Sequence, residues 1–278
     1  MRKDDRLFLT RFYAIWVLVW WCFFYHNRSL LHMTPHIVFT ATDVDPVLVV
    51  ANNFGIVKNL VQHRFYCYVL DYSILAFALL AVFFPLRKYW YIGLLLTLGL
   101  FDYGYAALTF HHSHGLYSLV TMALPFCFIE KEKEFPLLWR LARYIPIFLY
   151  LMAFYWKVKG GAFLHPMQGV ANVKENLPGI IVDGKGIPYA EFIAFFLRHP
   201  FMMNALNTLG FCIEGAFAVA LFTKKMDVPL MVAAILLHVS IVFFLDAYFT
   251  YHLIILLPLL PIEKVRGSLV YRFLTQKY

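Results

Sequence analysis

The residues with the clearest chemical potential lie in the stretch 150–163, where an apolar run passes through Lys157 before Gly160 and Gly161. A lysine inside a bilayer costs about 2.5–3.5 kcal/mol on insertion scales, so it marks a functional site by default. The alternative is that Lys157 and Lys159 lie near a helix end and simply reach the lipid headgroups. The other polar residues favour the first interpretation.

Ionisable residues interrupt several apolar runs. When the chain is placed across a membrane with its N-terminus inside, most of them fall in the outer half of their run. They are Asp71, Asp102, His111, His112, His114, Glu214, His238, Asp246 and His252. Ionisable groups within membrane spans face a protein interior or a wet cavity and pair with one another. Together with Lys157, they predict a polar pocket that opens toward the outer leaflet.

Each of these residues also has a simpler structural interpretation. His111, His112 and His114 can be solvated imidazoles of an interfacial turn, and His238 can be a satisfied histidine of the helix core. Glu214 can link helices through hydrogen bonds. His111 and His114 would share a face of a helical turn, but no second pair of ligands at a recognisable spacing supports a metal site.

Lysine in such a pocket could act as a general base. Near hydrocarbon the ammonium form is disfavoured, so the neutral amine becomes available close to neutral pH. The like charge of Lys159 would assist this change, and a neighbouring carboxylate would oppose it. No GxGxxG, P-loop, HExxH or GxSxG motif occurs in a credible context, which disfavours nucleotide-binding, metalloprotease and serine-hydrolase functions.

The composition identifies the class of protein that must position these residues. Hydrophobic residues make up 62% of the 278 residues and charged residues 14%, with a mean hydropathy of +0.69. Soluble domains are near 45–50% apolar and about 25% charged. The sequence therefore predicts an all-α integral membrane protein. Its net charge of +8 reflects basic cytoplasmic loops and not nucleic-acid binding.

About eight apolar runs are long enough, or nearly so, to cross a hydrocarbon core of about 30 Å. The expected transmembrane helices form one bundle and cover 7–25, 65–84, 90–110, 112–129, 145–161, 201–222, 228–246 and 249–262. Two long connections, 26–64 and 162–200, each contain an apolar patch typical of a short helix on or in the membrane surface.

The distribution of Lys and Arg predicts the orientation. Segments expected on the same side as the N-terminus carry twice as many of these residues as the segments on the other side. The positive-inside rule therefore places both termini in the cytoplasm. The first apolar run has no small-residue cleavage site after it, so we expect an uncleaved span and not a signal peptide.

Four short motifs follow one another along the chain in a recognisable order. They are Arg11-Phe12 opening the first span, His111-His112-Ser113 before Leu116-Tyr117, Ala153–Lys159 with its two lysines, and His238 in the penultimate span, preceded by Glu214. In these motifs and in topology the chain resembles the HTTM (horizontally transferred transmembrane) domain family. That family includes the membrane part of vitamin K-dependent γ-glutamyl carboxylase. The resemblance covers nearly all of 1–278 as a single domain without an extramembrane part.

The resemblance implies an enzyme with lyase or oxidoreductase chemistry. Lys157 would deprotonate a membrane quinol, such as reduced vitamin K. The deprotonated quinol would react with dioxygen to give a base strong enough to remove a carbon-bound proton. His112 and His238 would hydrogen-bond the developing negative charge. The expected contacts of the cofactor are His111, His114, Tyr155, Trp156, Lys159 and Glu214.

The sequence departs from the carboxylase in two ways. The carboxylase has a large soluble domain after its last span, whereas this sequence stops at Tyr278, so glutamate carboxylation of a clotting-type substrate does not carry over. The lysine pair is spaced Lys-Val-Lys, and Phe163 stands near the expected tryptophan. Lys157 is the preferred base, and Lys159 is the alternative.

The resemblance also implies where the protein acts and what it meets. We expect a multi-pass protein of a bacterial inner or plasma membrane, with its pocket facing outside. Its partners would be membrane lipids and a small peptide or protein substrate at the exoplasmic face. The alternative is a non-enzymatic membrane factor that binds a lipid or peptide for maturation, export or immunity. A transporter is disfavoured because the sequence has no inverted repeat.

Overall fold

The structure is a computed structural model. The residues that it describes are 1–28, 30, 54–55, 59–60, 62–109, 114–165, 167–177, 188–245 and 250–276. The chain is 86% helical and contains no strand within these ranges. The all-α class predicted from the composition is therefore confirmed.

Five helical segments are long and apolar enough to cross a membrane, counted over the described residues. They are Lys3–Phe23, Arg64–Phe83, Glu134–Lys159, Pro200–Phe222 and Lys224–Leu245. Each contains a predominantly apolar stretch of 18 residues, which is about the length that a bilayer core requires. These five support a membrane protein, and the total of eight spans remains a prediction.

Two of the expected spans are short within the part of the chain that the structure describes. α7 (His114–Phe126) has 13 residues, which corresponds to about 20 Å at the α-helical rise. The last expected span is the 3₁₀ helix η3 (Thr250–Leu259) of 10 residues, also about 20 Å long. Both are shorter than a hydrocarbon core of about 30 Å. Proline lies inside both helices, at Pro125 and Pro258.

The chain divides into two compact units, and each is described by itself. Unit 1 comprises Met1–Arg140 and Pro261–Tyr278, and unit 2 comprises Leu141–Leu260. The helices of unit 1 are α1 (Lys3–Arg28), α5 (Arg64–Phe83), α6 (Lys88–Thr109), α7, α15 (Ile262–Val265) and α16 (Leu269–Thr275). Helix α8 (Glu134–Ala142) crosses the boundary between the units. The single bundle expected from the sequence stays a prediction.

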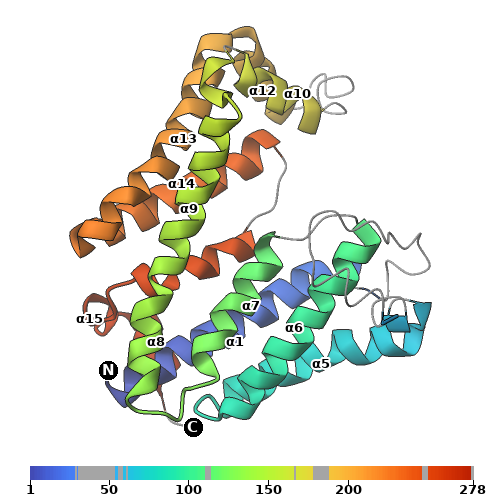
Figure 1. Cartoon of the computed structure of the whole chain (residues 1–278), viewed down its shortest axis with the longest axis vertical. Coiled ribbons are helices and arrows are strands. Elements are labelled where there is room, and N and C mark those ends of the chain that lie inside the picture. Colours follow the sequence, from blue (N-terminus) through green and yellow to red (C-terminus); the bar gives the residue numbers. More distant parts are fainter. Residues whose placement is uncertain are drawn as a thin grey trace. The chain divides into compact units, whose positions relative to one another are not determined.

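The core of unit 1 is aromatic. The Tyr13 ring from α1 lies 5.0 Å, centroid to centroid, from the Phe126 ring of α7, which lies 5.3 Å from the Tyr91 ring of α6. All three side chains are completely buried. Burying a tyrosine requires a partner for its hydroxyl, and Tyr13 donates to the Leu119 carbonyl at 2.8 Å. These contacts join α1 to α6 and α7, which are distant from it in sequence (Figure 1).

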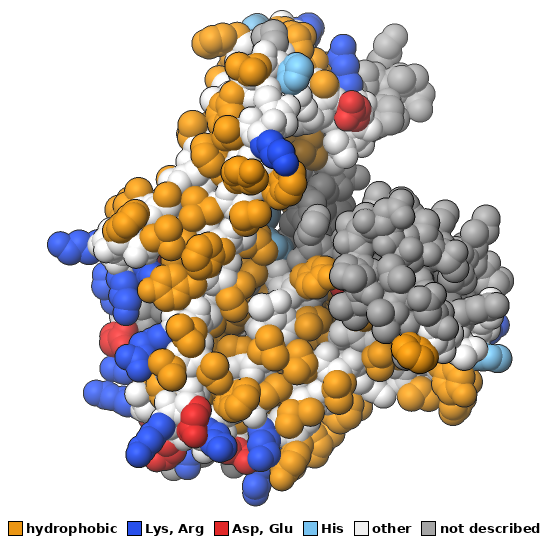
Figure 2. Space-filling view, viewed as in Figure 1, with side chains coloured by type: hydrophobic (Ala, Val, Ile, Leu, Met, Phe, Trp, Pro, Cys, Tyr) orange, Lys and Arg blue, Asp and Glu red, His pale blue; other side chains and the backbone are white. Residues whose placement is uncertain are grey.

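Both termini of the chain lie at one end of unit 1 (Figure 1). There Arg6 donates to the Ile129 carbonyl at 3.2 Å, and Arg266 donates to Asp5 through two nitrogens at 2.8 and 3.0 Å. Lys and Arg side chains gather around this end of the unit (Figure 2). Segments predicted to face the cytoplasm are thus neighbours in the fold, as one side of a membrane requires.

Unit 2 contains the remaining described helices. They are α9 (Tyr144–Lys159), η1 (Ala162–Leu164), α10 (Gln168–Asn176), α12 (Pro188–Arg198), α13 (Pro200–Phe222), η2 (Lys224–Met226), α14 (Asp227–Leu245) and η3. Helix α13 is central and packs against α9, α10, α12 and α14. Glycines let its neighbours approach closely: a Cβ atom at Gly215 would lie 3.0 Å from the Phe154 ring of α9.

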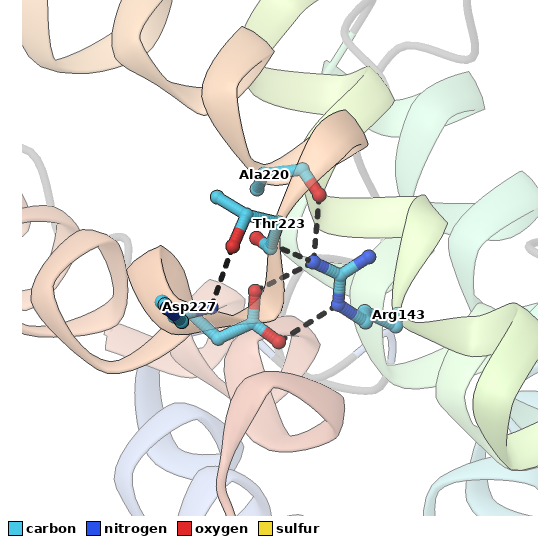
Figure 3. A network of polar contacts seen from close by, with 5 residues as sticks. Arg143, Ala220, Thr223 and Asp227 are labelled. Carbon is cyan, nitrogen blue, oxygen red and sulfur yellow. Dashed lines mark hydrogen bonds and ion pairs between the residues drawn. The ribbon is translucent and has the colours of Figure 1, made fainter.

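A buried ion pair fixes one end of unit 2 (Figure 3). The Arg143 guanidinium donates to both oxygens of Asp227, at 2.7 Å each. One of its nitrogens also donates to the Ala220 carbonyl at 2.6 Å and to the Thr223 carbonyl at 3.2 Å. Arginine thus neutralises the carboxylate and satisfies carbonyls that the end of α13 leaves open. The start of α9 is held beside the end of α13, so the two helices are antiparallel.

Candidate functional site

Lys157 lies near the end of α9 and forms an ion pair with Glu214 of α13. Its ammonium nitrogen also lies 5.0 Å from the centre of the Phe211 ring. The glutamate side chain is 9% exposed and the lysine side chain 36%. The lysine is therefore held by a carboxylate and an aromatic face, and it does not extend freely into the surroundings.

The direction of the Lys157 side chain follows from helix geometry. Arg143 contacts Thr223, so distances along α9 and α13 can be compared from that point. The Lys157 backbone lies about 21 Å along α9 from Arg143. Glu214 lies only about 13 Å along α13 from Thr223. Helical side chains lean toward the N-terminus of their helix, so Lys157 points back along α9 to meet the glutamate. This direction is opposite to that of a lysine that reaches past its helix end toward lipid headgroups.

The local sequence explains both halves of the pair. Phe211 and Glu214 are three residues apart on α13, so they lie on the same face and receive the lysine together. Gly160 ends α9 directly after Lys159. Gly161 then turns the chain with φ of +70°, a conformation that glycine adopts without a steric penalty.

The ion pair lies on the wall of a cavity of about 420 Å³ in unit 2. Its apolar wall comes mainly from α13 and α14 and includes Leu206, Leu209, Ile213, Leu236, Leu237, Ile241 and Phe244. Its polar lining consists of Lys157, Glu214, Asn172, Asn207 and Ser240. Ligand sites are commonly apolar clefts of roughly 300–1,000 Å³ with a few polar groups, and this cavity has both properties.

Glu214 contributes a buried oxygen that lacks a hydrogen bond. Its Oε1 accepts from Lys157, while its Oε2 is buried and has no hydrogen-bond partner among the described residues. A buried acceptor without a donor costs about 1–3 kcal/mol. Because the glutamate borders the cavity, a change of its side-chain rotamer that exposes Oε2 would let a ligand hydroxyl or amine supply that donor.

Amide contacts hold α10 against the polar side of the cavity. The Gly169 backbone N–H donates to Asn204 at 2.8 Å, and Asn172 donates to Asn207 at 3.4 Å. The approach is close, since a Cβ atom at Gly169 would lie 2.7 Å from the Met203 carbonyl oxygen. Neutral hydrogen-bonding groups therefore line the same cavity as the ion pair.

A second polar cluster lies within unit 2. The Tyr150 hydroxyl and His238 Nε2 are 2.7 Å apart, and the His238 and His252 rings are 5.4 Å apart, centroid to centroid. Tyr150 also stacks on Phe217, with ring centres 4.2 Å apart. Tyr150 shares the Lys157 face of α9, because the two residues are seven positions apart.

The remaining predicted cofactor contacts in unit 2 lie elsewhere on α9. Tyr155 and Trp156 are 52% and 57% exposed, and neither borders the cavity. The Lys159 ammonium lies 4.5 Å from the centre of the Trp156 ring. The structure thus brings Glu214 to Lys157 and separates these three residues from the pair.

The predicted histidine cluster is described only in part. His111 and His112 lie outside the described residues. His114 is the first residue of α7, in unit 1, whereas Lys157 and His238 belong to unit 2. A role for His112 beside the lysine therefore stays a prediction. Asp71 and Asp102 are buried within unit 1, and Asp246 lies outside the described residues.

Sequence reasoning missed Tyr150 and the asparagines. Tyr150 could have been predicted from the sequence, since it precedes Lys157 by two helical turns on the same face of the helix. Asn204 and Asn207 are three residues apart on α13, which places them on one face toward a neighbouring helix. The partner helix α10 lies in a polar connection, and its position cannot be read from periodicity.

No group of three His, Cys, Asp or Glu side chains that could hold a metal ion occurs among the described residues. Comparisons of the chain with protein-family models, with curated proteins and with solved structures find no match. The class that the structure itself supports is a helical membrane protein with an apolar cavity and an ion pair on its wall.

Proposed function

We propose that this chain is an integral-membrane enzyme that binds a lipid-soluble molecule in the cavity of unit 2 and moves a proton at the Lys157–Glu214 pair. The observation that carries the proposal is the ion pair on an apolar cavity wall, with Glu214 Oε2 lacking a donor. A reduced quinone of the vitamin K type fits these features, because it combines an apolar body with hydroxyl groups. When bound, it would supply an acidic hydroxyl and reducing electrons.

The geometry changes the roles expected for the two residues. The Lys157 nitrogen already donates to Glu214 Oε1, which leaves it poorly placed as the first proton acceptor. Glu214 Oε2 is the better acceptor, because it is a buried oxygen without a donor. The Lys157 ammonium would then stabilise the negative charge that remains on the ligand, as positioned cations do in many active sites.

The proposal includes the orientation in the membrane. Both termini lie in the cytoplasm, and the end of α9 that carries Lys157 lies toward the outer side. The support is that Arg6 and Arg266, from segments predicted to be cytoplasmic, lie at one end of unit 1. Arg143 likewise lies at the end of α9 opposite Lys157. The substrate would then be a peptide or lipid-soluble molecule at the outer face of a bacterial inner or plasma membrane.

A second candidate is a non-enzymatic factor that binds a lipid or peptide. The observation that favours it is the ion pair itself, since a satisfied pair needs no reaction to explain its presence. In that case the cavity would hold its ligand without proton transfer.

The test uses a lipid-soluble naphthol whose absorbance differs between its neutral and ionised forms. The purified protein in lipid nanodiscs should bind the naphthol and shift it toward the ionised form. Lys157→Met removes the cation that stabilises the ionised form, so this variant should keep binding but lose most of the ionisation, by roughly tenfold or more. Lys159→Met is the matched control, because Lys159 does not border the cavity, and it should behave as wild type.

The outcomes separate the two candidates. Binding without ionisation in the wild type would contradict the enzyme and support the binding factor. An equal loss of ionisation in Lys159→Met would contradict the assignment of the site to Lys157 and Glu214.

A further inference from the structure

The cavity lies where bulk membrane lipids can reach it. Three leucines of α13 and α14 that line it also have exposed surface: Leu206 is 39% exposed, Leu209 56% and Leu236 63%. Hydrophobic side chains dominate the visible surface in this part of the chain (Figure 2). In a bilayer such a surface contacts acyl chains. Phospholipids therefore surround the opening and compete with any specific ligand.

The charges on the wall are balanced. Among the described residues that line the cavity, Lys157 and Glu214 are the only charged ones, and they are already paired with each other. A phosphate group would need a cation that is free to bind it, but here it would meet a lysine whose charge is compensated and a carboxylate that repels it. The other polar lining groups are the neutral side chains of Asn172, Asn207 and Ser240.

The glutamate favours a different headgroup. Its Oε2 is buried, lacks a hydrogen-bond partner among the described residues and belongs to a side chain on the cavity wall. A hydroxyl can donate to it, whereas a phosphodiester has no donor at neutral pH. The same carboxyl group therefore attracts hydroxyl-bearing molecules and repels anionic headgroups.

We infer that Glu214 makes the cavity selective for neutral lipids that carry a hydroxyl group and excludes phospholipids. This inference rests on the proposed cavity, but it concerns which lipid is bound and not whether a proton is transferred. It also assigns the specificity to one residue. Replacing Glu214 by a neutral residue leaves Lys157 uncompensated and converts the site into one that accepts phosphate.

The test compares two photoactivatable lipids with the same acyl chains, diacylglycerol and phosphatidylmethanol, an anionic phosphodiester without a hydroxyl group, in nanodiscs that contain the full chain. In the wild type, diacylglycerol should cross-link within 206–241 in preference to phosphatidylmethanol by roughly tenfold or more, as expected for one repulsive charge at a short distance. Glu214→Gln should reverse this preference. Glu191→Gln is the control, because Glu191 lies exposed on α12 and away from the cavity lining.

A second variant guards against misfolding of Glu214→Gln. The double variant Lys157→Gln with Glu214→Gln removes both charges and should lose the preference for phosphatidylmethanol that the single variant gains. An equal yield of both lipids in the wild type would overturn the inference. So would an unchanged preference in Glu214→Gln, or no cross-link to either lipid. If the cavity prefers diacylglycerol but does not ionise the naphthol, the proposed enzyme is contradicted and this inference holds.

Discussion

Lys157 and Glu214 show how a single pair decides between interpretations of a membrane lysine. The sequence allowed a lysine that reaches lipid headgroups, and the structure instead directs the side chain back to a buried carboxylate. The carboxylate also changes the proposed chemistry, since the lysine nitrogen already donates to it. The pair is therefore the proposed unit of function, and its two members should be tested together.

The first prediction concerns the stability of this pair. Lys157→Met should destabilise unit 2 by about 3 kcal/mol, the low end for a broken buried pair, because the lysine is partly exposed. The double change to Lys157→Met with Glu214→Leu should restore most of the loss, since no buried charge then remains. Reversible unfolding in detergent measures both. Equal destabilisation in the single and double variants would contradict the account, and Lys159→Met should change stability by less than about 0.5 kcal/mol.

A second residue-scale prediction concerns pH. Burial and the hydrogen bond to Asp5 raise the pKa of Tyr271 to about 12. A group whose pKa is raised by folding contributes stability below its unfolded value, near 10 for tyrosine. That contribution is lost as the pH rises through about 12. The difference in melting temperature between the wild type and Tyr271→Phe should thus shrink between pH 10 and 12, and a constant difference would contradict this.

At the scale of elements, α10 is the least expected contributor to the site. It lies in a connection of mixed composition, yet its Gly169 and Asn172 border the cavity. Its position depends on side-chain amides of α13 and on the absence of a Cβ atom at Gly169. The cavity therefore depends on a contact between helices that hydropathy cannot reveal.

The prediction for this element is that Gly169→Ala displaces α10. The new Cβ atom would lie 2.7 Å from a backbone oxygen of α13, which cannot move as a side chain can. We expect a loss of about 1–3 kcal/mol, typical of overpacking, together with weaker naphthol binding. Gly99→Ala is the matched control, because nothing lies within 4 Å of the added atom. Equal effects of the two changes on binding would contradict the proposed position of α10.

At the scale of the whole molecule, composition and hydropathy were sufficient to predict a helical membrane protein. The long apolar runs near 65–84 and 201–222 appear as α5 and α13 with ends within a few residues. The run at 249–262 was predicted to be a transmembrane helix, whereas the structure has a 3₁₀ helix there that contains Pro258. Apolar composition identifies such a segment without fixing its helix type or its length.

The candidate site was predicted only in part, and the reason is physical. Lys157 and Glu214 were each visible as charges in apolar runs, and a buried charge requires a partner. The pairing of the charges depends on helix rotation and on close contacts, such as that of Gly215 with Phe154. Neither can be predicted from a single sequence. The exposed positions of Tyr155 and Trp156 are a consequence of the same rotation of α9.

The orientation of the whole chain gives a prediction at this scale. With the four native cysteines replaced, Ser113→Cys should react with an impermeant thiol reagent applied from outside, and Ser268→Cys should react only after the membrane is opened. The reason is the excess of Lys and Arg in the segments at the two termini. Labelling of Ser268→Cys from outside would reverse the proposed orientation.

The central claim is that a ligand hydroxyl gives its proton to Glu214 beside Lys157. Infrared difference spectroscopy tests it most directly, because the carboxyl stretch reports the protonation of a single side chain when the naphthol binds. We predict that a protonated carboxyl band appears in the wild type and in Lys159→Met and is absent in Glu214→Gln. No new carboxyl band in the wild type, or the same band in Glu214→Gln, would contradict the account.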